Sequence, residues 1–361
     1  MTSPDASTEA GLDRQRLIGP TPADTGAELS SQQIDQWRSS GYTFVRGLVP
    51  QFLTTELEAA ARERFPDPAT PEAESYTDFG SAGGLVFPAT VHEFNELTLH
   101  PKLIAAVASL LGCNPEDLRL TQSDLWPKYA RQRRSGSQDN SDQRIHVDYP
   151  NHTLAHPTPW ERPEAVEMIV YLSDYTQTGG ATAVVPREGE NDPLYPWPII
   201  DSPGIGDLRY INNRDDAEAY FAEQRPQLAG WRQRLYQRER YANFRSGDIL
   251  FYRHDTWHRG TPMHAGALRL VMNITYRRAE AEWISTLHTG WAWQAYRDSK
   301  YLEKLIAGAS LQQRAVIGFP QPQSSYWCEA TLEAVQARYG MFGFDITPYA
   351  DAIAAREKQV T

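Results

Sequence analysis

Hydrophobic positions in the first part of the chain recur at helical spacing, interrupted by one strand-like run. A helix containing SQQIDQW can be capped by Ser30 or Ser31 and should end at Gly41, before the β-branched and aromatic run at 42–45. Further helices are predicted from about 51 to 64 and within HPKLIAAVASLLG, between Pro101 and Gly112. Residues 1–28 hold almost no bulky apolar side chains, so we expect a mobile tail there.

From Leu118 to Arg278 the pattern changes to short apolar runs separated by Gly, Pro, Asp and Asn. These runs are LRLTQSDLW, RIHVDY, VEMIVYLSDY, ATAVVP, GDILFYR and LRLVMNITYR. No regular helix separates each pair, which argues against a doubly wound parallel sheet and favours a sandwich, barrel or jelly roll. We predict a jelly roll, mainly β with flanking helices.

One long segment, residues 187–245, interrupts the strand pattern; we call it the insertion. It is rich in Tyr and Trp, and a helical stretch beginning near Asp215 should break around Pro226. Such a segment is either a lid or a packing flap. Residues 281–361 are expected to be mainly helical, so we predict a β domain over 29–280 that carries the insertion, with a helical extension packed on it.

Composition narrows the classes of function. The 361 residues include 35 Lys and Arg against 46 Asp and Glu, a net charge of −11, which argues against binding to nucleic acid or an anionic membrane. Cys113 and Cys328 form no CxxC motif, and the longest aliphatic run, 103–111, is too short to span a bilayer. A reduced, cytoplasmic setting is expected, with the oligomeric state left open.

Three residues suggest a metal site. His146 and Asp148 stand at i and i+2 of a predicted strand, so both side chains can reach one ion, although such a pair alone is common. His258 follows about 100 residues later, and Arg269 stands 11 positions beyond it. Two histidines and one carboxylate on one face of an ion are typical of non-haem Fe(II) oxygenases. In such a site Arg269 is a candidate to bind the distal carboxylate of 2-oxoglutarate. Considered alone, it would be an ordinary surface arginine on a strand.

These residues lie within segments that resemble the phytanoyl-CoA dioxygenase (PhyH) family of Fe(II)/2-oxoglutarate-dependent oxygenases. The similarity covers roughly residues 30–278, including LSSQQIDQWRSSGYTFVRGLV, HPKLIAAVASLLG, HVD, TGGATAVVP and GDILFYRHDTWHRG. It implies a double-stranded β-helix, a cupin-like jelly roll. It also implies that His146, Asp148 and His258 bind iron, that Arg269 holds the distal carboxylate of 2-oxoglutarate, and that Lys128 lies near this cosubstrate. Gly260 departs from the family pattern, which commonly has a hydroxyl residue there.

Other polar residues are better explained by structural or surface roles than by catalysis. His254 precedes His258 at H-x3-H spacing, but a strand before it would make it a neighbour of the site and not a ligand. His152 and His156 are expected to be hydrogen-bonding loop residues or part of a substrate rim. A basic cluster could bind an anionic substrate but fits a solvated loop better; it comprises Lys128, Arg131, Arg133, Arg134 and Arg144. Three further residues flank the ligands and can be structural or can line a pocket: Tyr149, Asn151 and Trp257.

The function expected from this resemblance is hydroxylation, or another oxidation, of a C–H bond in a small molecule. The reaction would use Fe(II), 2-oxoglutarate and O2 and release succinate and CO2. Halogenation is disfavoured because related halogenases have a small residue in place of Asp148. Two rival interpretations stay open: a zinc hydrolase built on the same three residues, which gives Arg269 no role, and a non-enzymatic jelly roll that binds a metal or ligand.

Overall fold

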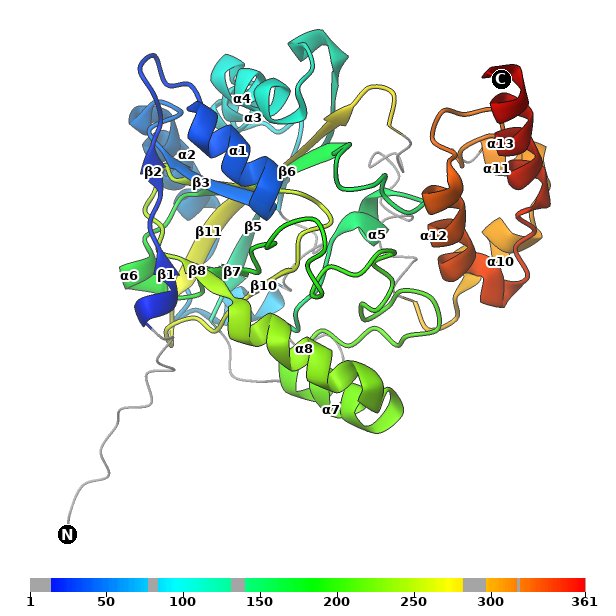
Figure 1. Cartoon of the computed structure of the whole chain (residues 1–361). Helices are drawn as coiled ribbons and strands as arrows, with labels where there is room; N and C mark the ends of the chain where they lie inside the picture. Colours follow the sequence, from blue (N-terminus) through cyan, green and yellow to red (C-terminus); the bar gives the residue numbers. More distant parts are fainter. Residues whose placement is uncertain (1–13, 77–83, 131–139, 282–296, 317–318, 361) are drawn as a thin grey trace.

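Two β-sheets face each other in the computed structural model, which describes residues 14–76, 84–130, 140–281, 297–316 and 319–360 (Figure 1). The larger sheet has the order β2-β3-β9-β6-β11-β5-β4. Its strands are β2 (Thr21–Pro22), β3 (Tyr42–Arg46), β9 (Ile249–Tyr252), β6 (Ala165–Tyr171), β11 (Leu268–Arg278), β5 (Leu118–Tyr129) and β4 (Leu85–Val86). Neighbouring strands are antiparallel except for the parallel pair of β2 and β3.

The smaller sheet has the order β1-β8-β7-β10. Its strands are short: β1 (Leu17–Ile18), β8 (Arg240–Ala242), β7 (Thr182–Val184) and β10 (His258–Gly260). A buried apolar layer lies between the sheets, where the Tyr171 ring stacks on Phe244 with centroids 4.1 Å apart. The Tyr171 hydroxyl also bonds Thr182 Oγ1 at 2.8 Å, which ties β6 to β7.

Four helices cover the outer face of the larger sheet (Figure 1). They are α1 (Ser31–Ser40), α2 (Gln51–Arg64), α3 (His92–Thr98) and α4 (Pro101–Leu111). Ser30 and Gln33 form a capping box at the start of α1, and Gly41 ends it in the left-handed conformation at φ 86°. The chain continues directly into β3, so the predicted helix and strand are both confirmed, as are the helices at 51–64 and 101–111.

The insertion contributes α7 (Arg214–Gln224) and α8 (Pro226–Arg238), which separate at Pro226 as predicted. The short helices α5 (Tyr149–His152) and α6 (Tyr175–Thr178) follow the metal-site segment and β6. The last helices form a group beside α5 in Figure 1: α10 (Tyr301–Gly308), α11 (Leu311–Val316), α12 (Glu329–Tyr339) and α13 (Thr347–Val360). They pack on the loop after α5, because Arg338 and Tyr339 donate hydrogen bonds to the carbonyls of Thr153 and Leu154.

The expectation of a tail over 1–28 is wrong for its second half. Leu17–Ile18 pairs with β8 and Thr21–Pro22 pairs with β3, so ordered structure starts well before residue 29. Residues 1–13 lie outside the described residues. Within the described parts of the chain, none of the helices combines the length and apolar composition that crossing a membrane requires.

Candidate metal centre

His146, Asp148 and His258 come together although they lie on different elements. His146 and His258 form an isolated bridge in which each backbone N–H donates to the carbonyl of the other at 2.9 Å. Asp148 stands at the start of α5, where its backbone N–H donates to the carbonyl of His254 at 3.1 Å. The sequence predicted a regular strand for RIHVDY, but this segment has a single bridge, at His146, and Gln143 just before it has another.

The three side chains point their metal-binding atoms at one another. Both imidazoles present Nε2 to the Asp148 carboxylate, at 3.4 Å from His146 and 3.1 Å from His258. All the candidate ligand atoms lie within 4.8 Å of one another, and His146 and His258 are almost fully buried. Burial, with the charges of Arg144 and His258, lowers the pKa of His146 to about 4.

Hydrogen bonds from the other ring nitrogens fix how the imidazoles are oriented. The Nδ1 atoms of His146 and His258 lie 3.1 Å and 2.9 Å from the carbonyl oxygens of Arg144 and Thr256. A carbonyl only accepts, so each Nδ1 carries a proton, and Nε2 is the ring atom that faces Asp148. Burial alone would raise the pKa of Asp148, but its two histidine neighbours hold it well below the usual range. Two imidazole Nε2 atoms and a carboxylate that converge in a buried place could hold a divalent cation between them.

Arg269 and Lys128 are cross-strand partners on β11 and β5, and both are buried. The Arg269 guanidinium donates a hydrogen bond to the Gly180 carbonyl, in the turn before β7. A Cβ at Gly180 would lie 2.6 Å from Met263 Cγ, and Gly180 has φ 65°, so glycine is required at this turn. Two buried cations side by side form a corner suited to a dicarboxylate.

The surroundings of Gly260 explain why glycine stands where the family commonly has a hydroxyl residue. A Cβ at this position would lie 2.7 Å from Gln143 Oε1 and 3.1 Å from Lys128 Nζ. The Gly260 backbone N–H also donates to Gln143 Oε1 at 2.7 Å. The Gln143 and Lys128 side chains therefore take the space that a hydroxyl side chain would need.

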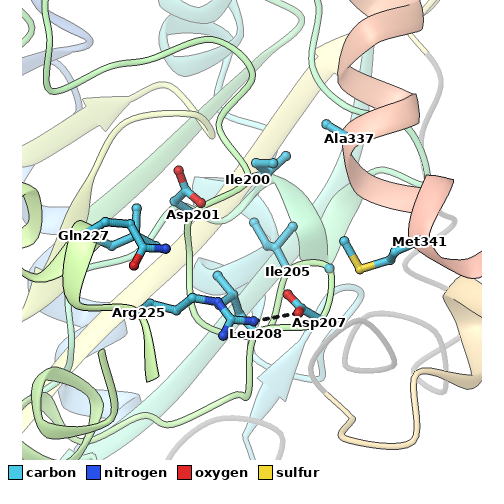
Figure 2. Close-up of a pocket in the computed structure, with 11 residues that line it drawn as sticks. Ile200, Asp201, Ile205, Asp207, Leu208, Arg225, Gln227, Ala337 and Met341 are labelled. Atoms are coloured by element: carbon cyan, nitrogen blue, oxygen red, sulfur yellow. Dashed lines mark hydrogen bonds and ion pairs between the residues drawn. The ribbon is translucent and has the colours of Figure 1, made fainter. Parts of the chain in front are cut away.

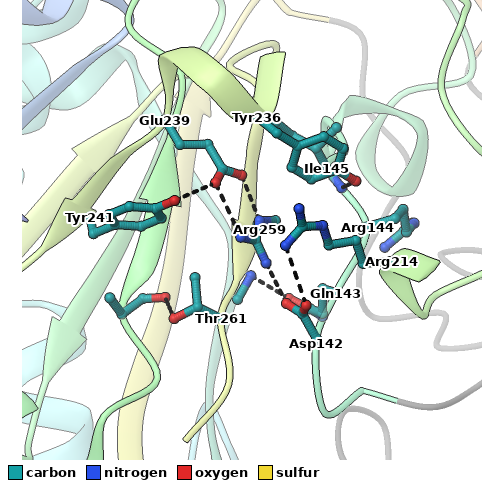
Figure 3. A network of polar contacts seen from close by, with 12 residues as sticks. Asp142, Gln143, Arg144, Ile145, Arg214, Tyr236, Glu239, Tyr241, Arg259 and Thr261 are labelled. Carbon is teal, nitrogen blue, oxygen red and sulfur yellow. Dashed lines mark hydrogen bonds and ion pairs between the residues drawn. The ribbon is translucent and has the colours of Figure 1, made fainter. Parts of the chain in front are cut away.

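A network of buried charges lies beside β10 (Figure 3). Arg259 follows His258 and donates to both oxygens of Glu239, at 2.5 Å and 3.1 Å, and to Asp142. Tyr241 donates to Glu239 at 3.0 Å. Because Asp142 lies near the start of the segment that carries His146, this network joins the two histidine-bearing segments to the end of the insertion.

The insertion also holds the residue before His146. The Tyr236 hydroxyl accepts from the Ile145 backbone N–H at 3.0 Å and donates to Glu218 at 2.7 Å. Arg232 donates to the same Glu218 and to the Ile145 carbonyl at 3.3 Å. Helices α7 and α8 thus hold the backbone of the metal-site segment, as the packing interpretation of the insertion predicts.

The remaining residues singled out in the sequence are placed as follows. His254 is not part of the group of candidate ligands found among the described residues. His156 is a hydrogen-bonding residue, since its Nε2 accepts from the Ile199 N–H at 2.9 Å. Tyr149 and Trp257 are fully buried and donate to the carbonyls of Ile199 and Leu194, so both are structural. Of the basic cluster, Lys128 and Arg144 are buried, and Arg131, Arg133 and Arg134 lie outside the described residues.

Glu167 was not predicted from the sequence, although it is the one acidic residue in the apolar run VEMIVY. Its carboxyl is buried 3.4 Å from His152 Nε2. Burial and the nearby Asp148 carboxylate raise its pKa well above the usual value. Glu167 is therefore a buried carboxyl with a raised pKa that adjoins the metal centre.

A separate hollow lies between the insertion and α12 (Figure 2). Its wall includes an ion pair of 2.6 Å between Arg225 and Asp207, together with apolar side chains such as Ile205 and Met341. None of the three candidate ligands lines it.

One family of known proteins is similar to this chain over most of its length. A family model described as phytanoyl-CoA dioxygenase (PhyH) matches residues 37–271. No curated protein matches the chain.

Solved structures resemble the chain at low identity. One is the non-heme alpha ketoglutarate dependent carbocyclase SnoK from nogalamycin biosynthesis, 18% identical over 72% of this chain and 89% of that chain, with a TM-score of 0.50. EvdO2 from Micromonospora carbonacea var. aurantiaca is 15% identical over 70% and 91%, with a TM-score of 0.48. EctD from S. alaskensis, solved with 2-oxoglutarate and 5-hydroxyectoine, is 16% identical over 71% and 78%, with a TM-score of 0.46. With the family match, the first of these confirms the predicted double-stranded β-helix.

Proposed function

The chain belongs to the phytanoyl-CoA dioxygenase (PhyH) family of Fe/2-oxoglutarate-dependent oxygenases, and from this we propose that it hydroxylates a C–H bond of a small molecule. When bound, iron and 2-oxoglutarate supply the oxidation: O2 and 2-oxoglutarate are consumed, succinate and CO2 leave, and one oxygen atom enters the substrate. The observation that carries the proposal is the convergence of His146 Nε2, His258 Nε2 and the Asp148 carboxylate on one point.

The chain's own residues then have defined tasks. His146, Asp148 and His258 hold the metal, and the backbone carbonyls that accept from the two Nδ1 atoms keep both rings oriented. Arg269, with Lys128 beside it, binds the distal carboxylate of 2-oxoglutarate. The buried surroundings of both groups exclude water from the place where the substrate is oxidised.

Anaerobic titration with Fe(II) and 2-oxoglutarate tests the proposal before any substrate is known. We expect the visible metal-to-ligand charge-transfer band of such a chelate in the native protein and its loss in His146→Ala. His92→Ala is a matched control, because the His92 side chain is 84% exposed. If the native protein shows no band and retains no iron, the oxygenase proposal is wrong.

Two measurements separate the proposal from its alternatives. A zinc hydrolase or a non-enzymatic binding protein would release no succinate from 2-oxoglutarate in a metabolite screen, whereas the oxygenase would. Product mass then defines the reaction, because hydroxylation adds one oxygen atom while ring closure, the activity named for the structurally similar carbocyclase, adds none.

A further inference from the structure

Arg144 is a buried arginine without a carboxylate partner among the described residues. It is 2% exposed, and its Nε makes no hydrogen bond. Three buried arginines near the metal centre differ, because Arg232, Arg253 and Arg259 each pair with a carboxylate. A buried cation without a counter-charge is costly, so the place beside Arg144 favours an anion.

Hydrogen bonds starting at Arg144 run in one direction and end at an unused donor. Arg144 Nη1 donates to Asn212 Oδ1 at 2.8 Å, and Asn212 Nδ2 donates to Asn140 Oδ1 at 3.2 Å. Since arginine can only donate, the orientation of both amides is fixed. Asn140 Nδ2 is therefore a donor, and it is buried without a partner among the described residues. Two donors, Arg144 Nε and Asn140 Nδ2, thus lack an acceptor at the two ends of one hydrogen-bonded chain through Asn212.

This region adjoins the metal centre. Arg144 lies two residues before His146, and its carbonyl is the group that accepts from His146 Nδ1. The Arg144 guanidinium lies over the Tyr210 ring, 4.8 Å from the centroid.

The region is distinct from the corner formed by Arg269 and Lys128. Arg144 bonds Asn212 of the insertion, whereas its neighbour Gln143 bonds Gly260, beside Lys128. We propose that Arg144 and Asn140 bind a carboxylate group of the substrate that the enzyme oxidises, so that this substrate is a small carboxylic acid held next to the metal. The proposal rests on the oxygenase function argued above.

Binding of simple carboxylates tests this assignment. The full chain is loaded with Co(II) and saturating 2-oxoglutarate, which occupies the Arg269 corner, and titrated calorimetrically with acetate and benzoate. Acetamide and benzamide serve as neutral counterparts. We expect at least one carboxylate to bind about tenfold or more tightly than its amide, and Arg144→Met to remove that preference. Arg209→Met is the control, because the Arg209 side chain is 59% exposed on the same segment as Tyr210.

Asn140→Asp provides a second test that does not depend on removing the arginine. The substitution replaces the unpartnered Asn140 Nδ2 donor with an acceptor oxygen and places a negative charge one side chain away from Arg144, so we expect an unchanged or higher melting temperature together with loss of carboxylate binding. The assignment is wrong if the native protein shows no preference for either carboxylate, or if Arg144→Met keeps it.

The cosubstrate is the other possible source of a carboxylate. Arg144→Met could instead raise the 2-oxoglutarate concentration needed to form the Fe(II) band while leaving acetate and benzoate binding intact. In that case Arg144 holds the cosubstrate and the proposal is overturned. Failure of the oxygenase function itself would appear differently, as absence of that band in the native protein.

Discussion

Each imidazole of the metal centre is oriented by the backbone carbonyl two residues before it, Arg144 for His146 and Thr256 for His258. A backbone acceptor cannot be removed by substitution of its own side chain. The ring orientation should therefore survive changes at Arg144, so a change in metal binding and a change in substrate binding can be measured separately.

At Arg269, we predict that Arg269→Ala raises the 2-oxoglutarate concentration needed for half-saturation by about tenfold to a hundredfold, because a buried charge-assisted contact is lost. The half-saturating concentration for Arg269→Lys should lie between those of the native protein and Arg269→Ala, since lysine keeps the charge without the planar fork. Titration of the Fe(II) band measures both. Arg119→Ala, on the exposed side of β5, is the control, and an unchanged requirement in Arg269→Ala would exclude the role.

At Gly260, we predict that Gly260→Ala displaces Gln143 and Lys128, because the new Cβ would lie within 2.7 Å and 3.1 Å of their side-chain ends. Both atoms are the ends of flexible side chains, so the variant should lose only about 1 kcal/mol of stability or less but require severalfold more 2-oxoglutarate. Thermal unfolding and the Fe(II) titration test the two parts. Gly230→Ala is matched to it, since nothing lies within 4 Å of a Cβ there; equal behaviour of both variants would contradict the prediction.

At the scale of elements, helices α7 and α8 support the segment that carries His146. Their side chains reach both the N–H and the carbonyl of Ile145, through Tyr236 and Arg232. The segment has no long strand pairing of its own, so these contacts replace the ladder that a regular strand would provide.

For this support we predict that Tyr236→Phe weakens metal binding by about fivefold to tenfold while the fold is retained, because the buried Ile145 N–H loses its acceptor. Competition between the Co(II)-loaded protein and a chelator measures the affinity. Tyr220→Phe on α7 is the control, as its hydroxyl has no hydrogen bond to a described residue. Identical affinity in native protein and Tyr236→Phe would show that the insertion does not position His146.

Elements whose apolar residues recur at a regular spacing could be predicted from the sequence. Elements held in place by single contacts to distant segments could not. Helix α4 and strand β11 follow directly from their apolar spacing. RIHVDY alternates like a strand, yet the N–H groups of Arg144 and Ile145 bond Asn212 and Tyr236 of the insertion, which no local pattern reveals. For the same reason Glu167 and Asn140 were missed: Glu167 is a single acidic residue in an apolar run, Asn140 is one of many polar residues in its loop, and their contacts come from distant segments.

At the scale of the whole molecule, the C-terminal helices pack on the loop that follows α5 and enclose it. Tyr326 donates to the His156 carbonyl at 2.5 Å, and Tyr339 bonds Leu154. His156 is consequently 1% exposed, and burial lowers its pKa to about 3.

From this burial we predict a dependence of stability on pH. The unfolded chain binds a proton at His156 below its ordinary pKa of about 6.5, whereas the folded protein excludes it until about pH 3. The free energy of unfolding should therefore fall as the pH drops through this window, by about 1.4 kcal/mol per pH unit from this residue. Urea unfolding at several pH values should give a smaller slope for His156→Gln. The exposed His92→Gln should keep the native slope, and equal slopes in all three proteins would contradict the prediction.

The two short strands near the N-terminus bear on how the chain folds. β1 joins the smaller sheet by pairing Leu17 with Tyr241, while β2 joins the larger sheet by pairing Thr21 with Val45. During synthesis the partner of β2 emerges early, but the partner of β1 appears only after most of the chain has been made. The smaller sheet, and with it the contact between β10 and the metal-site segment, is therefore completed late, and a nascent chain that stops before residue 242 lacks the edge on which its first strand closes.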